Sequence, residues 1–241
     1  NMEINSISYD SRTLEPGALF VTLSGSKTDG HRYVAQALEK GAAAILCREP
    51  PRTGSWLSTP DPRAALARVS AAWFGYPGEE MTLIGVTGTK GKSSTTYYLR
   101  HILDEYLAPK GSSCGVISSI DTYDGVENFE SHLTTPEPLE LQKHFANALS
   151  SGLGCLVMEV SSQALKYHRT LGTRFAAACF LNIGRDHISP VEHPDFQDYF
   201  LSKLKIFAQA DFSCVNLDCD HAGEALAAAR RDCAHVRTFS R

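Results

Sequence analysis

The chain has 241 residues, enough for one or two domains, and its 23 Lys and Arg against 27 Asp and Glu give a net charge of −4. Hydrophobic residues make up 43% of the chain and charged residues 21%, which is typical of a soluble globular protein and argues against disordered or fibrous classes. The acidic balance disfavours a large nonspecific nucleic-acid surface, and no apolar run approaches the roughly 20 residues that a membrane span needs. Residues 1–5 lack the basic and apolar regions of a signal peptide.

The cysteines indicate a reducing environment. There are seven, an odd number, and no CxxC pair occurs. Several lie inside apolar, strand-like runs, where a thiol packs as a small hydrophobic group. We therefore expect a cytoplasmic protein rather than a disulfide scaffold or a zinc module.

The first part of the chain is expected to form a small α/β unit. Strands are predicted at residues 18–23 and 43–47, and helices at residues 33–40 and 62–73. Turn residues follow at 74–78. The expected division is therefore an N-terminal domain, residues 1–77, and a second domain, residues 78–241.

In the second domain, strands and helices alternate. Strands are predicted at residues 82–87, 155–159, 177–181, 212–216 and 235–238, and helices at 92–106, 138–150, 195–208 and 222–231. This alternation predicts an α/β fold with a mostly parallel sheet. Residues 112–130 interrupt it with Gly, Asp and short β-like pieces, which indicates a hairpin insert.

The most specific motif is a glycine-rich loop, residues 88–91, between a predicted strand and a predicted helix. Glycines let backbone N–H groups approach phosphate oxygens, and a helix start adds unpaired N–H groups and a positive dipole end. Lys92 is suited to neutralise phosphates, and the hydroxyl of Ser93 to bind Mg²⁺. The usual pattern has glycine at the position of Val86, so the loop is a variant. Its context favours nucleotide binding over a plain turn.

Two neighbouring strands are expected to bring polar groups to the same edge. Glu159 ends one strand, and Asp186 and His187 follow the next. Ligands of parallel sheets collect at the carboxyl ends of strands, so Glu159 is a candidate Mg²⁺ ligand, directly or through water. The alternatives are a helix cap or solvated edge for Glu159 and a structural role for His187.

Three other features have plain interpretations when taken alone. Lys203 shares a helix face with Tyr199 and Phe207, and composition favours a buried stem with the amine in water. The pair Thr134–Thr135 precedes a helix, where capping is the default and an anionic ligand the alternative. The stretch 10–12 is an ordinary turn.

In order and spacing, these residues together resemble the Mur ligases, specifically the MurE type. The similarity spans nearly the whole chain. It rests on Asp10-Ser11-Arg12, residues 16–20, Asp29-Gly30-His31, residues 87–93, Thr134-Thr135-Pro136, residues 158–162, His168-Arg169, Asn182 with Asp186-His187, and Tyr199 with Lys203. The N-terminal set separates this type from folylpolyglutamate synthetases, which are similar only in the ATP-binding domain.

The resemblance implies a UDP-binding N-terminal domain followed by a phosphate-loop central domain that is incomplete here. It assigns ATP binding to Gly88, Thr89, Lys90, Gly91, Lys92, Ser93 and Ser94. It assigns Mg²⁺ to Ser93, Glu159, His187 and Lys203, the last as a carbamate, and catalysis to Lys92, Glu159, His187 and Lys203. The implied contacts to the UDP-muramyl substrate are Ser11, Ser26, Lys27, Thr28, Thr134, Thr135, Ser161 and Arg169.

The implied activity is ATP-dependent amide formation through an acyl phosphate, adding an amino acid to a UDP-N-acetylmuramyl dipeptide in peptidoglycan precursor synthesis. Family members continue well beyond Arg241 with a third domain, so we expect no turnover by this chain alone. Two classes of alternative stay open. One is another enzyme, either a ligase resembling folylpolyglutamate synthetase or an amidotransferase partner that acts on a lipid-linked muramyl substrate. The other is a non-catalytic module that binds a nucleotide or UDP-sugar. The sequence does not indicate which amino acid is added.

Overall fold

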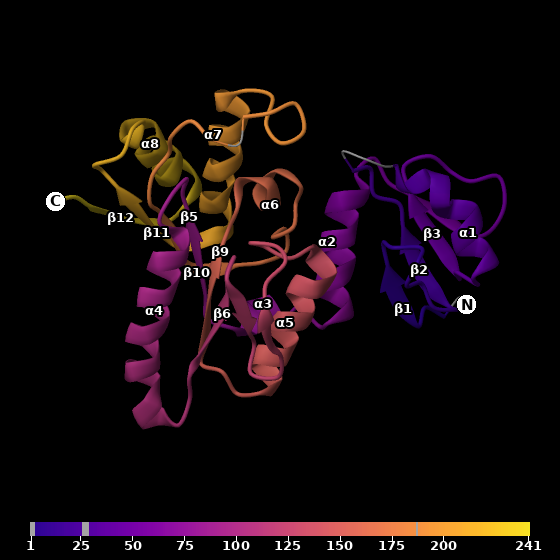
Figure 1. The fold of residues 1–241 in the computed structure, drawn as a ribbon, viewed down its shortest axis with the longest axis horizontal. Coiled ribbons are helices and arrows are strands. Elements are labelled where there is room, and N and C mark those ends of the chain that lie inside the picture. Colours follow the sequence, from indigo (N-terminus) through magenta and orange to yellow (C-terminus); the bar gives the residue numbers. More distant parts are fainter. Residues whose placement is uncertain (1–2, 26–28, 187) are drawn as a thin grey trace. The chain divides into compact units, whose positions relative to one another are not determined.

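The computed structural model describes residues 3–25, 29–186 and 188–241. Ser26, Lys27, Thr28 and His187, all candidate site residues, lie outside the described residues. The chain divides into two compact units, residues 1–70 and 71–241, each described here by itself (Figure 1). The division falls within a helix, so the functional boundary at residues 77 and 78 stays a prediction.

The first unit is a small parallel sheet with helical cover. Its elements are β1 (Ser6–Ser8), β2 (Ala18–Val21), η1 (Gly30–Tyr33), α1 (Val34–Glu39), β3 (Ala44–Cys47), β4 (Trp56–Ser58) and the start of α2 (Pro62–Trp73). The four strands lie in chain order and are all parallel. Phe20 and Ile45 of the central strands pack with Ala37 of α1, as expected for the apolar strands predicted there.

The second unit is built on an eight-stranded sheet among the described residues. Its elements are α3 (Pro77–Glu80), β5 (Leu83–Thr87), α4 (Lys92–Leu107), η2 (Ala108–Lys110), β6 (Cys114–Ile117), β7 (Asp121–Tyr123), β8 (Asn128–Glu130), α5 (Pro138–Ser150), β9 (Cys155–Glu159), α6 (Ser162–Lys166), β10 (Phe175–Phe180), α7 (Phe196–Leu204), η3 (Lys205–Gln209), β11 (Ala210–Asn216), α8 (Ala222–Asp232) and β12 (His235–Phe239). The strand order is β12-β11-β10-β5-β9-β6-β7-β8, and the first six are parallel.

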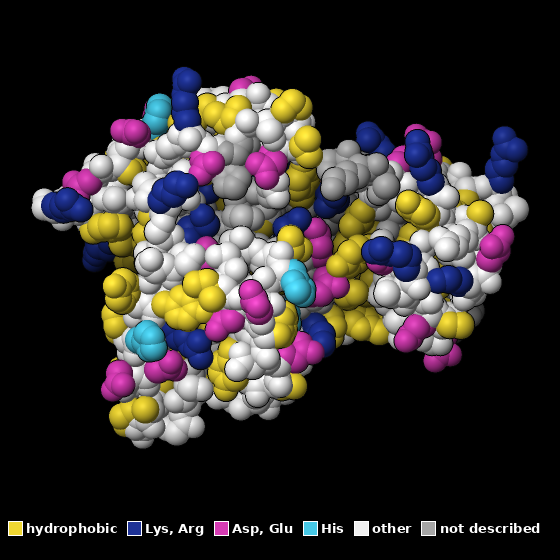
Figure 2. All heavy atoms as spheres, in the orientation of Figure 1, with side chains coloured by type: hydrophobic (Ala, Val, Ile, Leu, Met, Phe, Trp, Pro, Cys, Tyr) yellow, Lys and Arg dark blue, Asp and Glu magenta, His cyan; other side chains and the backbone are white. Residues whose placement is uncertain are grey.

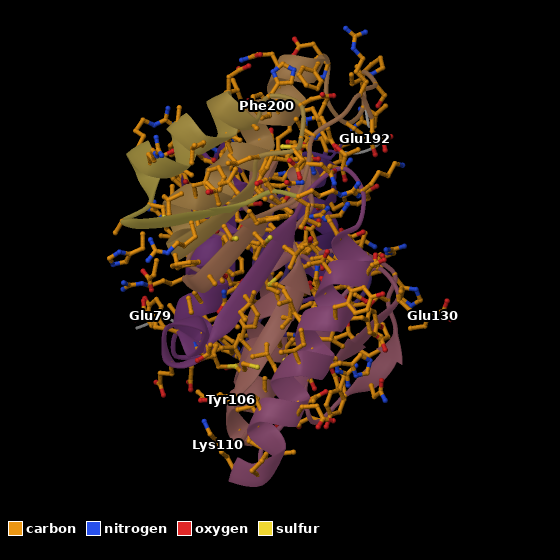
Figure 3. All side chains as sticks on the ribbon, turned by 90° about the vertical axis from the view of Figure 1, so that its left-hand side faces the viewer. Glu79, Tyr106, Lys110, Glu130, Glu192 and Phe200 are labelled. Carbon is orange, nitrogen blue, oxygen red and sulfur yellow. The ribbon has the colours of Figure 1, made fainter. Side chains whose placement is uncertain are left out.

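Alternate side chains of these strands form two separate cores. Ala178 and Phe180 of β10 belong to the core that includes α5, α7 and α8. Val86 of β5 and Val157 of β9 belong to the core that includes Leu103 of α4. Helices therefore cover both faces of the sheet, as a parallel sheet requires. In Figure 3, α4 runs along the sheet, with Tyr106 and Lys110 at the end remote from Glu192 and Phe200.

The predicted elements of the second domain are confirmed, with small shifts at their ends. The helix expected over 195–208 ends as an α-helix at Leu204 and continues as the 3-10 turn η3. The insert expected at 112–130 contains two antiparallel pairings, β6 with β7 and β7 with β8. However, β6 also pairs in parallel with β9, which the sequence did not indicate.

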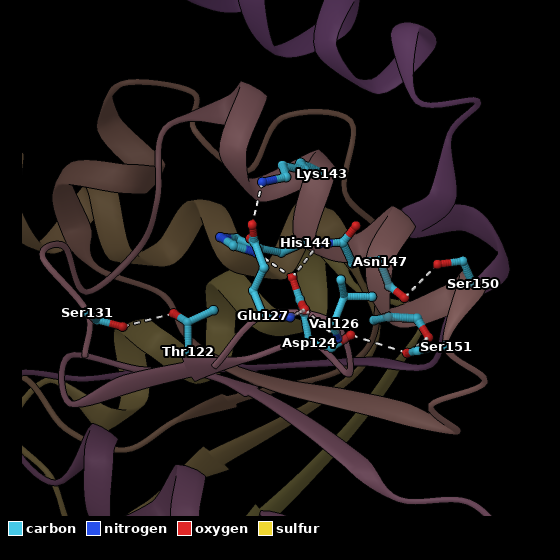
Figure 4. Close-up of polar contacts among 11 residues, drawn as sticks. Thr122, Asp124, Val126, Glu127, Ser131, Lys143, His144, Asn147, Ser150 and Ser151 are labelled. Atoms are coloured by element: carbon cyan, nitrogen blue, oxygen red, sulfur yellow. Dashed lines mark hydrogen bonds and ion pairs between the residues drawn. The ribbon is translucent and has the colours of Figure 1, made fainter. Parts of the chain in front are cut away.

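A buried carboxylate ties this hairpin to α5 (Figure 4). Asp124 Oδ1 accepts from the N–H groups of Val126 and Glu127, and its Oδ2 accepts from His144 Nδ1 at 2.7 Å and Asn147 Nδ2 at 2.8 Å. The oxygen and nitrogen atoms of Asp124, Glu127 and His144 lie close enough together to hold a metal ion. Since each carboxylate oxygen of Asp124 already accepts two hydrogen bonds, we interpret the cluster as structural.

Charged side chains of both signs are mixed on the drawn face of the larger unit, and the cysteines are free. On the face of the larger unit drawn in Figure 2, basic and acidic side chains are interspersed rather than gathered into one basic patch. All seven cysteines are free. Within the described ranges, no helix is both long and apolar enough to pass through a bilayer.

Candidate functional site

The carboxyl ends of four neighbouring parallel strands meet at one edge of the larger sheet. β5 ends at Thr87, where the glycine-rich loop begins, and β9 ends at Glu159. The register pairs Val86 with Glu159, so the carboxylate lies one strand away from the start of the loop. β6 and β10 end at the same edge and continue into residues 118–119 and 181–182.

Two glycines give the loop its shape. Gly91 has φ +81°, a left-handed conformation that a residue with a Cβ adopts only with strain, and it is the N-cap of α4. At Gly88, a Cβ would lie 3.0 Å from the Cβ of Leu181, tighter than most real contacts. Both glycines are therefore needed for the strand to turn into α4 beside β10.

The side chain of Asn182 holds the loop from the neighbouring strand. Its Oδ1 accepts from the N–H groups of Thr89 at 3.0 Å and Lys90 at 2.9 Å, while its Nδ2 donates to the Lys90 carbonyl. These two amides are thus committed within the protein. The first N–H groups of α4 have no intrahelical partner and remain suited to an anion.

Ser119 links the helix start to Glu159. Its N–H and hydroxyl donate to Glu159 Oε1 at 2.9 and 3.1 Å, and its Oγ lies 3.2 Å from Ser93 Oγ. Glu159 is 1% exposed, so the alternative of a solvated strand edge is wrong. Ser119 was not among the predicted site residues, although its place two residues after the apolar run of β6 was a usable signal.

Two lysines converge on the carbonyl oxygen of Gly88. Lys203 Nζ donates to it at 2.9 Å and Lys92 Nζ at 3.0 Å. Lys203 is 2% exposed, and its Nζ lies 4.8 Å from the centre of the Tyr199 ring. The expectation that its amine reaches water is therefore wrong: α7 directs this side chain inward, to the glycine-rich loop at residues 88–91, called the phosphate loop below for its predicted role.

Burial disfavours the charged form of both amines. It lowers the pKa of Lys203 to about 7, helped by the nearby charge of Lys92 and opposed by Asp186. Burial also lowers the pKa of Lys92, with Glu159 and Asp186 opposing the change. An anionic ligand here would add its negative charge to that of the nearby carboxylates, Glu159 and Asp186, and would favour the charged form of both amines.

A hollow of about 220 Å³ lies beside the two lysines. Lys92 and Lys203 line it together with Thr134, Ser161 and Arg169. The two lysines that donate to the loop and the candidate substrate contacts therefore line one hollow. Its basic groups, Lys92, Lys203 and Arg169, favour ligands with phosphate or carboxylate groups.

Arg169 and Thr135 shape this hollow through contacts with the protein. Arg169 forms an ion pair with Glu137 at 2.7 Å and donates to the Thr135 carbonyl at 3.0 Å. Thr135 is fully buried, its hydroxyl donating to the Glu159 carbonyl and accepting from the Ser161 N–H. The N-cap of α5 is Glu137, so capping of α5 by the threonines, the default expectation, is wrong.

The first unit contains a second hollow, of about 500 Å³. Ser11, Arg12, Tyr33 and Gln36 are among its lining residues. Ser11 Oγ donates to Gln36 Oε1 at 2.8 Å. Of the candidate contacts in this unit, Ser11 is therefore at a hollow, whereas residues 26–28 lie outside the described ranges. In the second unit, His187 also lies outside the described ranges. Its neighbour Asp186 forms an ion pair with Lys90 at 3.2 Å.

Both parts of the chain match a known protein family. Residues 86–241 match the Mur ligase middle domain, and residues 3–72 match the Mur ligase family, catalytic domain. The chain belongs to the Mur ligase family. The phosphate loop, Glu159 and Lys203 all lie within the middle-domain match.

Mur ligases of two organisms illustrate the relationship. The chain is 39% identical over 228 residues to UDP-N-acetylmuramoyl-L-alanyl-D-glutamate--2,6-diaminopimelate ligase of Clostridium botulinum, covering 92% of this chain and 46% of the relative. It is 40% identical over 222 residues to UDP-N-acetylmuramyl-tripeptide synthetase of Bifidobacterium longum, covering 90% and 41%. A solved structure of a diaminopimelate ligase matches 98% of this chain and 48% of its own, with a TM-score of 0.77 at 23% identity. The chain spans about half the length of these Mur ligases.

Proposed function

We propose that this chain is the nucleotide- and substrate-binding part of a MurE-type ligase, which joins an amino acid to a UDP-N-acetylmuramoyl dipeptide at the expense of ATP. One observation carries the proposal: the hollow lined by Lys92 and Lys203 of the phosphate-loop region is also lined by Thr134, Ser161 and Arg169. A triphosphate and a second anionic substrate would therefore meet in one place. The names of the two sequence relatives support the same reaction.

The chemistry requires activation of a carboxylate, which is a poor electrophile. An oxygen of the peptide carboxylate would attack the γ-phosphorus of ATP, forming an acyl phosphate and releasing ADP. The amine of the incoming amino acid would then attack the acyl carbon, and phosphate would leave. The protein contributes mainly positioning and charge neutralisation to such transfers.

The described residues suit these tasks. The first N–H groups of α4 would bind phosphate oxygens, and Lys92 would exchange its bond to the Gly88 carbonyl for the terminal phosphates. Arg169, fixed by Glu137, would hold an anionic group of the dipeptide substrate from the other side of the hollow. In the first unit, the hollow at Ser11 would take the uridine part.

Mg²⁺ fits the donors at the helix start. Ser93, Ser119 and Glu159 offer hydroxyl and carboxylate oxygens, the ligand type that this ion prefers. When bound, the ion would neutralise charge on the transferring phosphoryl group. His187 and a carbamate on Lys203 remain part of the proposed set. The burial of the Lys203 amine beside the phosphate loop supports the latter.

Ligand binding to the 241-residue chain tests the proposal. Calorimetry is expected to show that the chain binds Mg-ATP and UDP-N-acetylmuramoyl-L-alanyl-D-glutamate. The Lys92→Ala variant is expected to bind ATP at least tenfold more weakly. Lys110→Ala, a change in η2 beyond the remote end of α4, is the matched control. A chain that binds folate instead would indicate the folylpolyglutamate-type alternative.

A turnover assay distinguishes the proposed ligase from the remaining alternative, a non-catalytic binding module. The proposed reaction needs a site for the incoming amino acid, and we propose that the part of the relatives not spanned by this chain supplies it. ADP release by the 241-residue chain is therefore expected to be negligible even with all substrates present. A longer protein containing the chain is expected to release ADP with 2,6-diaminopimelate or another amino acid. A non-catalytic module would bind its ligands but release no ADP in either form.

A further inference from the structure

His193 is a fully buried histidine that the proposed reaction does not use. It follows the turn between β10 and α7, and its ring lies edge-on to that of Tyr199, with centroids 5.1 Å apart. Both ring nitrogens have partners: Nδ1 lies 2.6 Å from Asp198 Oδ2, and Nε2 lies 2.9 Å from Ser162 Oγ. His193 thus connects the first turn of α7 to the first residue of α6.

The partners determine which nitrogen carries the proton. Burial opposes ionisation of Asp198, but hydrogen bonds from Lys166 and His193 outweigh it and lower its pKa. Lys166 Nζ donates to the same Asp198 oxygen at 2.7 Å. An ionised carboxylate only accepts hydrogen bonds, so Nδ1 of His193 must be the donor.

The second nitrogen is then an acceptor. Burial lowers the pKa of His193, against the opposing effect of Asp198, which favours the neutral ring. A neutral imidazole has a single N–H group, and Nδ1 holds it. The hydroxyl of Ser162 therefore donates its proton to Nε2.

This arrangement fixes what Ser162 offers to the hollow that it lines. A free serine hydroxyl rotates and either donates or accepts, but this one has committed its single proton and keeps only lone pairs. Among the basic groups of the hollow, Arg169 and the protonated forms of Lys92 and Lys203 are donors only. They bind anionic groups of a ligand but offer nothing to an amide N–H. Gln163 and Glu192 also line the hollow and carry acceptor oxygens, whereas the Ser162 oxygen is an acceptor whose orientation His193 fixes from within the protein.

We propose that His193 is a positioning residue, which holds the Ser162 hydroxyl as a hydrogen-bond acceptor for an amide N–H of the peptidyl substrate. The inference rests on the proposed function, because it takes the hollow as the place where that substrate binds. Asp198 and Lys166 support the arrangement by holding the ring of His193. A purely structural role would instead need only the link from His193 to Asp198, which ties the turn to α7.

Two substitutions of His193 separate these roles. In His193→Gln, the side-chain amide reaches the position of Nε2 and retains an acceptor for Ser162. In His193→Asn, the shorter amide retains a donor at the position of Nδ1 for Asp198 but does not reach Ser162. Positioning of Ser162 predicts that the Gln variant keeps more substrate affinity than the Asn variant, whereas a structural role predicts the reverse order.

The affinity of the 241-residue chain for UDP-N-acetylmuramoyl-L-alanyl-D-glutamate is the first measurement. Ser162→Ala and His193→Asn are each expected to weaken binding about tenfold, with ATP affinity retained as evidence of folding. The double variant is expected to bind no more weakly than either single variant, because His193 acts through Ser162. Additive losses, or better binding by the Asn variant than by the Gln variant, would overturn the proposal.

The ring nitrogens of the wild-type protein provide a second measurement that needs no variant. In a sample with ¹⁵N-labelled histidine, NMR is expected to show the proton of His193 on Nδ1 and an unprotonated, hydrogen-bonded Nε2. A proton on Nε2 would overturn the proposal even if the affinities changed as expected. If the wild-type chain fails to bind the UDP-linked dipeptide, the proposed function fails instead, and the tautomer still decides what Ser162 offers.

Discussion

Lys203 donates a hydrogen bond of 2.9 Å to the carbonyl oxygen of Gly88, 115 positions earlier in the chain. A buried amine on α7 is thereby attached to the first residue of the phosphate loop. Lys92 donates to the same oxygen, so two lysines share one neutral acceptor. When both amines are protonated they repel each other, and the shared carbonyl carries no net charge to offset this repulsion. An anionic ligand would reduce the electrostatic energy of the pair.

The first prediction concerns pH and Lys203. Its pKa of about 7 in the folded protein lies below the ordinary lysine value of about 10.4, so between these values only the unfolded chain binds the proton. The free energy of unfolding should therefore rise with pH in this window, by at most about 1.4 kcal/mol per pH unit from this group. Below pH 7 both states bind the proton and the contribution to the slope disappears.

Urea unfolding in CO₂-free buffer at pH 7, 8 and 9 checks this expectation. Lys203→Met should remove this part of the pH dependence and should be more stable than the wild type at pH 7. Lys205→Met is the matched control, because Lys205 lies two residues further on and is exposed. Equal slopes for the wild type and the Lys203 variant would contradict the prediction.

The second prediction concerns Asn182 and the shape of the phosphate loop. Asn182→Ala removes the acceptor of two loop amides and the donor to the Lys90 carbonyl. The loop should then sample other conformations, and ATP affinity measured by calorimetry should fall about tenfold or more. Asn216→Ala is the control, since its side-chain amide donates to the Leu181 carbonyl and accepts from the Asp218 N–H, neither of which belongs to the loop. Similar losses in both variants would argue against a specific role for Asn182.

The third prediction concerns stability at the hairpin. His144→Ala leaves Asp124 buried with one fewer donor and should lower the free energy of unfolding by about 2–4 kcal/mol. Lys143→Ala removes an ion pair to Glu127 in which the lysine side chain is 48% exposed, and should cost less than about 1 kcal/mol. Because we interpret the cluster as structural, EDTA should leave the unfolding temperature unchanged. A large drop on chelation would instead identify a metal site.

The fourth prediction concerns the thiols. Burial raises the pKa of Cys179 to about 12, and Cys47, Cys114, Cys155 and Cys233 are buried. In the native protein a thiol-specific reagent should therefore react slowly, because the thiolate is the reactive form. In denaturant, all seven should react. Fewer than seven reactive groups under denaturing, non-reducing conditions would show that a disulfide had formed.

The sequence by itself determined the class of fold and the edge of the sheet where the site lies. Apolar runs of strand length separated by helical segments dictate a parallel sheet with helices on both faces. Residues that directly follow such strands, as Gly88 and Asn182 do, must lie near one edge. Glu159, the last residue of its strand, must lie there too. These conclusions depend only on local patterns and on the common direction of parallel strands.

Only the tertiary structure decided what each side chain contacts at that edge. Lys203 resembles a surface lysine in sequence, but α7 packs with its Lys203 side against the phosphate loop. Ser119 meets Glu159 because β6 pairs with β9, and Ser162 meets His193 because α6 and α7 are neighbours. Contacts between residues 31–115 positions apart depend on which elements become neighbours and in which register. Periodicity in the sequence does not contain that information.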